Sequence, residues 1–596
     1  MRRTPFLFVA LLPVVASLAL AGPLADAPSA FVRAHTNSPV QFMPWGEAAF
    51  ARAKAENKPV YVHVGAFTQE LARAMREQSF AREENATIMN EALVCVVVDR
   101  DEHPEVAAYL QAYVNHVKQM QGWPLSVWLT PDLKPFEGAS YLPPSDEWGK
   151  EGFPNVLRRV ISAWQTDPEA EAAKGDEALE SLAAMMPSAP QAVDASGVSA
   201  LLEEGAAARM ATFDAENGGF GDPPRRIEPE LLRFLLQRQE QAMRDAAATT
   251  LRAIASSPLR DPIDGGFFRS SADPTWTLPT LQKTLPDQAR AAFAYLDAGM
   301  VPPAAGAIAY VRSLGDPSRG YAGAEDGTAE AIIPTFLWTL ESARTAIGDD
   351  AGKALEALGI TEAGNLPPDA YLGVESSGTN LPRWAVPAAQ AEIDAAVGRL
   401  RAVRAARPAP ARDTLGTSGA HGLMLAAFAQ LGDKAALADA AGLNTLIRTK
   451  LITADGALRS GPAFTTGAAP RDYALVADGL LAYAAAAKDD AARAVALALI
   501  AKADALYWDA GAGRFLASPE RPSIGVGVRV VPPPPDSGDL PSADAAMLLV
   551  LAKHNLGDAA RRSQLASAIV ADVRESGMTA RGDQLLALQA WLATAK

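Results

Sequence analysis

The sequence predicts a two-domain protein, in which an α/β domain is followed by a larger domain built only of helices. Its 596 residues exceed the roughly 100–200 residues of a typical domain. Up to about residue 165, near-continuous apolar runs rich in β-branched residues alternate with helical segments, which is typical of a sheet covered on both faces. Beyond that point strand signals nearly vanish, and apolar residues recur at helical spacing.

Four apolar runs of the first domain are predicted to be strands, with helices between them. The predicted strands are residues 59–64, 93–99, 125–129 and 136–141. The predicted helices are residues 45–56, 71–78, 84–91 and 105–119. Pro124 stands directly before the third strand, where a cis peptide bond could shape a binding pocket.

Composition and charge exclude several classes of protein. With 49% hydrophobic and 21% charged residues, the chain can bury enough apolar surface to offset its conformational entropy. Its net charge of −15 argues against a general binder of nucleic acids or of anionic membranes. No phosphate-binding loop, dinucleotide fingerprint, metal-ligand spacing of histidines or nucleophile elbow is visible. The sequence therefore predicts neither a cofactor nor a metal ion.

The first 21 residues have the features of a secretory signal peptide. Arg2 and Arg3 supply a positive start, residues 5–18 are apolar, and an Ala-x-Ala cleavage site ends at Ala21. We therefore expect an exported protein, either periplasmic or secreted. A retained membrane anchor is the alternative, although the apolar run is short for a bilayer span. No later stretch is long and apolar enough to cross a bilayer.

The second half of the chain is predicted to contain about a dozen helices. An acidic, Ala- and Pro-rich stretch, residues 166–195, precedes them and is expected to be a linker that carries one helix. The predicted helices are residues 198–213, 229–256, 278–297, 305–313, 335–347, 390–406, 422–431, 472–487, 491–506, 543–556, 564–574 and 583–594. About twelve helices fit six helical hairpins.

Short turns that combine glycine with an aromatic residue recur between these helices. They occur at residues 217–220, 264–268, 319–321 and 513–515, and the first two repeat after about fifty residues. A helix-pair repeat of this length indicates an array of α-hairpins, either an open solenoid or a closed (α/α)6 barrel. A closed barrel would bring these turns to one mouth, where a ligand could bind.

Motifs along the first domain carry a resemblance to a known family. Among them are Asn-Ser-Pro-Val at 37–40, Asp-Arg-Asp-Glu-His-Pro at 99–104 and Gly-Trp-Pro-Leu at 122–125. With these motifs the chain resembles the spermatogenesis-associated protein 20-like family, in which a thioredoxin-like domain precedes a six-hairpin glycosidase-like barrel. The resemblance implies a thioredoxin-like domain over residues 30–165 and an (α/α)6 barrel over residues 196–596.

The chain departs from that family at the redox motif. Where the family carries Cys-His-Trp-Cys-His after its first strand, Gln69 and Ala72 replace the two cysteines. Dithiol exchange needs one thiolate to attack and a second thiol to resolve the mixed disulfide. Cys95, the only cysteine of the chain, lies in another strand and is expected to be a small buried hydrophobe. We therefore expect a redox-inactive domain, and a disulfide reductase is the more distant alternative.

Two family segments of the barrel are also changed, and the first of them has lost a titratable histidine and a carboxylate. The family's His-Phe-Glu-Lys-Met-Leu appears here as Thr-Leu-Gln-Lys-Thr-Leu at 280–285, and its Trp-Asn-Gly-Leu as Ala-His-Gly-Leu at 420–423. Glycoside hydrolysis usually needs two carboxylates beside the bond that breaks. The remaining candidates for such chemistry are Glu325, Asp326 and Asp287, with Asp264 and Asp472 as further acidic residues. Capping of a helix is the alternative role for these carboxylates.

Four aromatic residues near these positions are candidates for binding a sugar ring. Trp276, Tyr321, Trp338 and Tyr473 could each offer a flat apolar face, and burial in the core is the alternative, above all for Trp338 in its apolar run. Two functions follow. The favoured one is a non-catalytic exported scaffold that binds a carbohydrate or a protein of the cell envelope. The alternative is a carbohydrate-active enzyme, namely an isomerase, epimerase or hydrolase.

Overall fold

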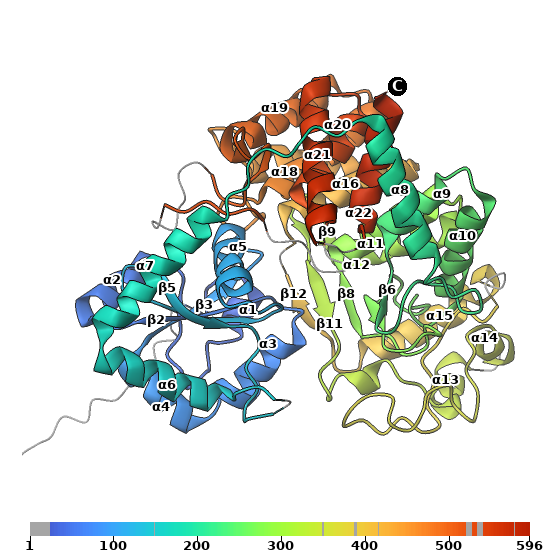
Figure 1. The fold of residues 1–596 in the computed structure, drawn as a ribbon. Helices are drawn as coiled ribbons and strands as arrows, with labels where there is room; N and C mark the ends of the chain where they lie inside the picture. The colour runs from blue at the N-terminus through green and yellow to red at the C-terminus, as the bar shows by residue number, and fades with distance from the viewer. Residues whose placement is uncertain are drawn as a thin grey trace, which may run out of the picture.

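The α/β domain and the helical domain lie side by side in the computed structural model of the chain (Figure 1). The structure describes residues 24–147, 149–348, 351–386, 390–414, 416–519, 527–532, 540–576 and 579–595. The predicted signal peptide, residues 1–21, lies outside the described residues.

The first domain is built on a mixed sheet, which has five strands among the described residues. Its order is β1-β3-β2-β4-β5, in which β1 and β2 run parallel to β3, while β4 runs antiparallel to both β2 and β5. The strands are β1 (Met43–Pro44), β2 (Val60–Gly65), β3 (Val94–Asp99), β4 (Leu125–Leu129) and β5 (Pro135–Ala139). The helices are α1 (Ala30–Arg33), α2 (Glu47–Glu56), α3 (Glu70–Ala74), α4 (Glu83–Ala92), α5 (Pro104–Ala112), α6 (Phe153–Thr166) and α7 (Pro168–Ala184).

Alternating side chains of the central strands bury two separate cores, one on each face of this sheet. On β2, Val60, Val62 and Val64 belong to a core shared with α2, α5 and α7. Tyr61 of β2 and Cys95 of β3 belong to the opposite core, which α1, α4 and α6 cover. Successive residues of a strand point to opposite faces, so a strand buried on both sides must be apolar throughout. This explains the near-continuous apolar runs, and it confirms the predicted thioredoxin-like fold.

In the described part of the second domain, six inner helices form a closed ring. Each inner helix packs against the next along the chain, and the last packs against the first. The inner helices are α9 (Pro229–Leu236), α11 (Leu285–Asp297), α16 (Ser418–Leu431), α18 (Pro470–Ala487), α20 (Ala543–Lys553) and α22 (Gly582–Thr594). Behind them pack, in the order of their inner partners, α10 (Gln241–Ser256), α12 (Val301–Ser313), α17 (Lys434–Leu446), α19 (Asp490–Tyr507), α21 (Ala559–Ser576) and α8 (Ala195–Met210). The predicted (α/α)6 barrel is confirmed, and the open solenoid is excluded.

The glycine-aromatic turns gather at one mouth of the barrel. Each of them follows an outer helix and precedes the next inner helix, so all stand at the end where the inner helices begin. Two of them fold back on the end of the outer helix through a β-bridge, Phe213 with Phe220 and Arg260 with Phe267. At Gly218 and Gly265 the backbone has a positive φ, which favours glycine.

The inner helices α16 and α18 cross so closely that only glycine fits between them. A Cβ added at Gly422 would lie 2.6 Å from the carbonyl oxygen of Leu475 and 2.6 Å from backbone atoms of Val476. A Cβ at Gly479 would meet the carbonyl oxygen of Gly422. The neighbouring atoms are backbone, so a methyl group can be accommodated only if the two helices separate.

Gly422→Ala is therefore expected to destabilise the barrel by about 1–3 kcal/mol. The matched control is Gly398→Ala in α15 (Gln390–Ala405), where an added Cβ meets nothing within 4 Å. Because alanine favours a helix over glycine by about 1 kcal/mol, this control is expected to be neutral or stabilising. Urea denaturation followed by circular dichroism measures both changes, and equal effects of the two variants would contradict the close crossing.

A small helical insertion and a short sheet complete the barrel domain. The insertion between α12 and α16 contains α13 (Leu340–Ile347), α14 (Ala351–Ala357) and α15, which pack around Trp338 and Trp384 in a core of their own. The short sheet has the order β12-β11-β8 and is antiparallel throughout. Its strands are β8 (Gln282–Thr284), β11 (Ala324–Asp326) and β12 (Ala411–Asp413). The other short strands are β6 (Arg225–Arg226), β7 (Ser270–Ser271), β9 (Gly315–Asp316), β10 (Gly320–Tyr321), β13 (Trp508–Asp509) and β14 (Arg514–Phe515).

The element boundaries differ from the sequence prediction in several places. The predicted helix 229–256 is divided into α9 and α10, and the predicted helix 278–297 begins only at Leu285, because residues 282–284 pair as β8. The prediction lacks helices α14 and α17, and the predicted helices 335–347 and 390–406 are α13 and α15 of the insertion rather than parts of the barrel hairpins. The helix expected in the linker is α7, which packs against β5.

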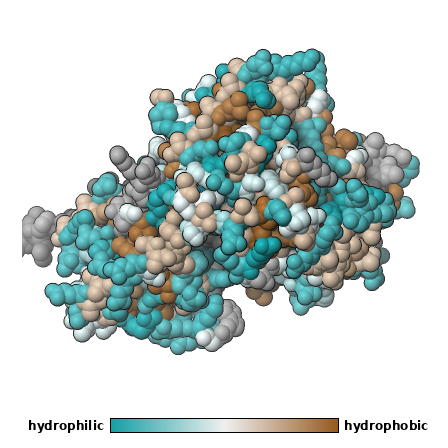
Figure 2. Space-filling view, turned by 45° about the horizontal axis from the view of Figure 1, so that its top comes forward, coloured by the Kyte–Doolittle hydropathy of each residue, from teal (hydrophilic) through white to brown (hydrophobic). Residues whose placement is uncertain are grey.

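The described helices include no candidate for a membrane span. Among the described residues, no helix combines the length and the apolar composition that crossing a membrane requires. On the face shown in Figure 2, hydrophilic side chains interrupt the apolar patches.

Candidate functional site

The loops at one edge of the thioredoxin-like sheet dock on the barrel mouth. Arg73 of α3 donates to Thr328 (2.8 Å) and forms an ion pair with Asp326 of β11 (3.4 Å). The Gln282 side chain of β8 donates to the carbonyl oxygen of Thr68 (3.0 Å). On the far side of the mouth, the hydroxyls of Ser460 and Thr466 donate to the carbonyl oxygen of Glu102. The first domain therefore touches the barrel on both sides of its opening.

Between these contacts lies a cavity of about 200 Å³, here called the interdomain cavity. The thioredoxin-like domain contributes Phe67 and Thr68 after β2, Arg100 and Asp101 after β3, and Trp123 before β4. The barrel contributes the first residues of α11, α16, α18 and α20. Because one water needs only ~10–15 Å³ of such space, the cavity has room for a small organic molecule.

Four inner helices point their N-terminal ends into the interdomain cavity. Their N-cap residues Thr284, Thr417, Ala469 and Ser542 all line it. Thr284, Thr417 and Ser542 cap their helices through a side-chain oxygen, while the Ala469 N–H donates to the Asp472 carboxylate (3.2 Å). Free N–H groups and aligned peptide dipoles make such helix ends partly positive.

Buried charges hold the barrel side of the cavity in place. Arg290 of α11 binds Glu230 of α9 through two hydrogen bonds, of 2.8 and 2.5 Å, and lies 3.4 Å from Asp287. Burial raises the pKa of Glu230, but the charge and hydrogen bonds of Arg290 outweigh it and lower the pKa below its ordinary value. Asp287 also accepts a hydrogen bond from the Thr284 hydroxyl (2.6 Å). The Asp287 carboxylate therefore reaches the cavity in a fixed orientation.

The thioredoxin-like side of the cavity also combines charged and aromatic groups. The Arg100 guanidinium lies 5.1 Å from the centre of the Trp123 ring. Behind it, Asp99 at the end of β3 is buried and accepts a hydrogen bond from the Ser29 hydroxyl (2.5 Å). Burial, followed by the charges of Asp101 and Asp413, raises the pKa of Asp99 well above its ordinary value. Across the interface, burial raises the pKa of Asp472 to about 6.

The positions of the lost redox motif stand beside this cavity. Gln69 is the N-cap of α3, and its side chain accepts a hydrogen bond from the Ala66 N–H (2.9 Å), while Ala72 is buried. The peptide bond between Trp123 and Pro124 is cis. Cys95 is buried in β3, and burial raises its pKa to about 12. Within the described residues, no thiol therefore stands at positions 69 and 72, where the resemblance implies a pair of cysteines.

The candidate carboxylates do not converge on one point. Of the five, only Asp287 lines the interdomain cavity, and Asp326 lies on the same side of the short sheet in its ion pair with Arg73. Glu325 and Asp264 line a second cavity behind that sheet. Asp472 is buried beside the interdomain cavity, where it caps α18.

The four candidate aromatic residues are covered by protein in the structure. Trp276, Tyr321, Trp338 and Tyr473 are each about 1% exposed, and none of them lines either cavity. The Trp276 ring NH donates to the carbonyl oxygen of Asn217, and the Tyr473 hydroxyl accepts from the Leu458 N–H. The aromatic residues that do line the interdomain cavity are Phe67 and Trp123, of which only Trp123 belongs to a motif of the family resemblance.

Metal binding finds no support in the part of the chain that the structure describes. Within the described ranges, no three histidine, cysteine or acidic side chains come together in a way that could hold a metal ion.

Fold and site together define a protein in which a thioredoxin-like domain without its thiols covers the mouth of an (α/α)6 barrel. Residues 22–183 match a family model for a thioredoxin-like domain, described as a protein of unknown function, DUF255. Spermatogenesis-associated protein 20 of Rattus norvegicus is 29% identical over 573 residues, which cover 83% of this chain and 71% of the rat protein. The protein of the same name from Homo sapiens is 29% identical over 599 residues, which cover 89% of this chain and 74% of the human protein. Over most of its length the chain is therefore similar to spermatogenesis-associated protein 20.

Solved structures resemble the barrel more distantly. The cellobiose 2-epimerase of Spirochaeta thermophila has a TM-score of 0.39 and 13% sequence identity, and the match covers 67% of this chain and 96% of the epimerase.

Proposed function

We propose that the protein is a redox-inactive binding protein that holds a small, hydroxyl-rich ligand, of the carbohydrate class, in the interdomain cavity. The observation that carries the proposal is the cavity itself, because residues from both domains enclose it at the mouth of the barrel. Ligand sites in proteins occur preferentially in concave places between domains.

The chemistry of the cavity wall suits hydroxyl groups better than a single strong charge. Its guanidinium groups belong to Arg100, Arg269, Arg290 and Arg471, and its carboxylates to Asp101, Asp287 and Asp413. A hydroxyl can donate to a carboxylate and accept from a guanidinium at the same time, which neither an anion nor a cation can do. The faces of Phe67 and Trp123 supply the apolar surface that the C–H face of a sugar ring requires.

Redox inactivity is part of the proposal because the chain contains one cysteine. Gln69 and Ala72 cannot attack or resolve a disulfide, and Cys95 is buried with a raised pKa. A thioredoxin-like domain in this state still serves as a lid for the barrel. We therefore expect the purified protein not to reduce insulin.

The binding test measures thermal unfolding of the purified protein with a panel of mono- and oligosaccharides. A ligand at about 100 times its Kd stabilises the native state by roughly 2.7 kcal/mol. Ala108→Trp is expected to abolish the shift, because Ala108 of α5 lines the cavity and a tryptophan would fill it. Ala55→Trp, on the exposed face of α2, is the matched control and should keep the shift. A panel without any shift would contradict a carbohydrate ligand and favour a protein of the cell envelope.

The carbohydrate-active enzyme is the second candidate, and the observation that favours it is the Asp287 carboxylate in the cavity wall. The same experiment separates the two functions, because any sugar that binds can be incubated with the protein and followed by NMR. Turnover that Asp287→Asn abolishes would establish an enzyme. Binding without turnover would support the scaffold.

Export to the periplasm or the medium also belongs to the proposal. It rests on Arg2, Arg3 and the apolar residues 5–18 that precede the Ala-x-Ala site. Cleavage at that site would make Gly22 the first residue of the exported protein, and mass spectrometry of the N-terminus tests this. An uncleaved chain would support the membrane anchor instead.

A further inference from the structure

A second cavity of about 470 Å³, here called the side cavity, lies behind the short sheet of the barrel domain. Alternate residues of β8, β11 and β12 face the two cavities. Thr284, Ala324 and Asp413 pair across the sheet and line the interdomain cavity. The next row, Lys283, Glu325 and Arg412, also pairs and lines the side cavity. The sheet is therefore a wall between two separate sites.

Positive side chains outnumber negative ones around the side cavity, although the whole chain carries a net charge of −15. The six cationic residues of its wall are Arg260, Lys283, Arg401, Arg404, Arg407 and Arg412. The four carboxylates are Asp261, Asp264, Glu325 and Asp394. A cationic concavity on an acidic protein is a local feature that attracts anions.

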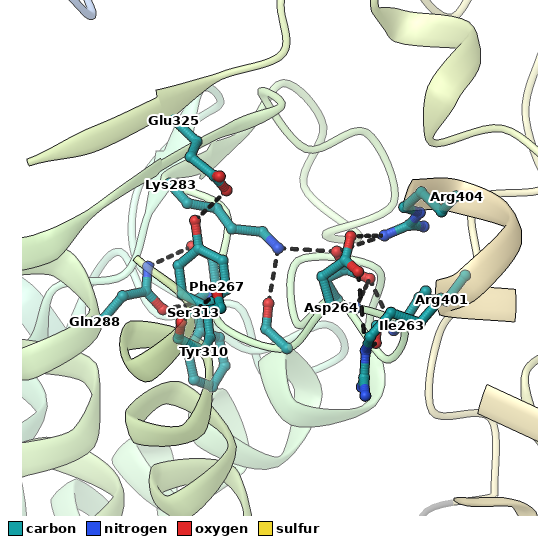
Figure 3. Close-up of polar contacts among 12 residues, drawn as sticks. Ile263, Asp264, Phe267, Lys283, Gln288, Tyr310, Ser313, Glu325, Arg401 and Arg404 are labelled. Atoms are coloured by element: carbon teal, nitrogen blue, oxygen red, sulfur yellow. Dashed lines mark hydrogen bonds and ion pairs between the residues drawn. The ribbon is translucent and has the colours of Figure 1, made fainter. Parts of the chain in front are cut away.

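Two of the carboxylates are shared between several cations. Asp261 accepts hydrogen bonds from Lys283 and from Arg404, each at 2.8 Å. Arg404 also reaches Asp264 (2.8 Å), toward which Arg401 of the same helix points (Figure 3). Glu325 accepts from the Tyr310 hydroxyl (2.5 Å) and from Arg412. These carboxylates are therefore already occupied by cations of the wall.

Other cations of the wall rest on aromatic rings. The Arg260 guanidinium lies 5.3 Å from the centre of the Trp384 ring. Arg407 lies 3.8 Å from the centre of the Trp338 ring and donates to the carbonyl oxygens of Thr335 and Leu337. Burial lowers the pKa of both arginines, because it disfavours the charged form. The Arg404 Nε is buried and has no hydrogen-bond partner within the described ranges.

We propose that the side cavity binds a small organic anion, with a phosphate or carboxylate group against its arginines and a flat apolar body against Phe336 and Trp384. Guanidinium groups bind these two anions through charge-assisted hydrogen bonds. The volume falls in the range of known small-molecule sites, ~300–1,000 Å³. The ligand can enter beside Arg401 and Arg412, whose side chains are 55% and 42% exposed. This site does not depend on the function proposed for the interdomain cavity.

The test is isothermal titration calorimetry of the purified protein with four probes, namely phenyl phosphate, benzoate, inorganic phosphate and neutral benzyl alcohol. Saturable binding of phenyl phosphate or benzoate is expected, with benzyl alcohol at least tenfold weaker. Phosphate binding as tightly as phenyl phosphate would still support an anion site but would remove the apolar body from the proposal. Benzyl alcohol binding as tightly as phenyl phosphate would overturn the anion site, and so would the absence of any saturable binding.

Two pairs of variants locate the site. Arg401→Gln is expected to weaken binding of phenyl phosphate about tenfold or more, because a hydrogen bond to a charged group is lost. Its control is Arg399→Gln, on the exposed face of the same helix, which should bind as the unmodified protein does.

The second pair removes no native contact. Ala309 of α12 is exposed and lines the side cavity, so Ala309→Glu adds a negative charge at the rim. It should weaken binding up to about fivefold at low salt, whereas the neutral Ala309→Gln should not. Unchanged affinity in both Arg401→Gln and Ala309→Glu would place the anion elsewhere and overturn the proposal.

Discussion

His63→Leu is expected to stabilise the thioredoxin-like domain, and more so at acid pH than at neutral pH. His63 lies on β2 with no exposed surface, and neither ring nitrogen has a hydrogen-bond partner within the described ranges. Its ring packs against Phe80 (4.9 Å between centres), His35 (5.6 Å) and Phe31 (5.7 Å). A buried polar group without a partner costs about 1–3 kcal/mol. Leucine is close to histidine in size and carries no polar atom.

The pH dependence has a definite sign. Burial, followed by the charges of His35 and Arg76, lowers the pKa of His63 well below its ordinary value. The folded domain therefore keeps His63 neutral, while the unfolded chain takes up a proton below about pH 6.5. The wild-type domain loses about 1.4 kcal/mol per pH unit in that range from this residue. Between pH 7 and pH 5 the advantage of His63→Leu should grow by about 2 kcal/mol.

The measurement must report on this domain alone, because the two domains need not unfold together. Hydrogen exchange of peptides from β2 and β3, read by mass spectrometry at pH 7 and pH 5, gives the free energy of opening locally. Comparison with the wild type at each pH removes the opposite contributions of Asp99 and Glu102, whose pKa values are raised by burial. His116→Leu is the comparison variant: burial lowers the pKa of the exposed His116 as well, but not as far as that of His63, so its pH-dependent gain should be smaller. An advantage of His63→Leu that does not change with pH would contradict the argument.

Local patterns predict both domains well, but not the places where distant segments meet. The apolar runs of β2 and β3 and the helical spacing of the barrel are properties of short windows, so they appear in the sequence. By contrast, the sequence predicts a helix at β8, because this strand exists only through its pairing with β11, which is about forty residues away. Helix α17 is rich in alanine and has little contrast between a polar and an apolar face, so its sequence gives only a weak helical pattern.

The candidate site was even harder to predict from the sequence than the fold, because it depends on contacts between distant segments. Asp287 is a candidate because it is a carboxylate, and it does line the interdomain cavity. Glu325 and Asp326 are neighbours in sequence, but their side chains face opposite sides of strand β11. Adjacent side chains of a β-strand point to opposite faces of the sheet. The local sequence around residues 324–326 has no strand pattern, so this separation of Glu325 from Asp326 is visible only in the structure. Tyr321 follows a glycine and Trp276 stands between two threonines, and neither setting tells from the sequence whether the ring is exposed. Only the packing around them shows that they belong to the core.

Replacing Gln69 and Ala72 together by cysteine is expected to restore a disulfide that the wild-type chain cannot form. Gln69 is the N-cap of α3, and Ala72 follows one turn later, where it is buried. A thiol at a helix N-terminus has a lowered pKa and is reactive as a thiolate, while a buried second thiol can resolve it. The reduced double variant has three thiols, including the native Cys95. After treatment with glutathione disulfide, titration in denaturant should find one.

The restored disulfide should react with small thiols far more readily than with proteins. The motif faces the barrel, because the Thr68 carbonyl oxygen accepts from Gln282 and Arg73 is paired with Asp326. Dithiothreitol should therefore reduce the double variant quickly, while reduction of insulin by this variant should stay slow. The single variant Gln69→Cys is the matched control and should form no internal disulfide. If the oxidised double variant keeps three titratable thiols, positions 69 and 72 do not have the geometry of a redox motif. Insulin reduction by the wild-type protein would instead contradict its proposed redox inactivity.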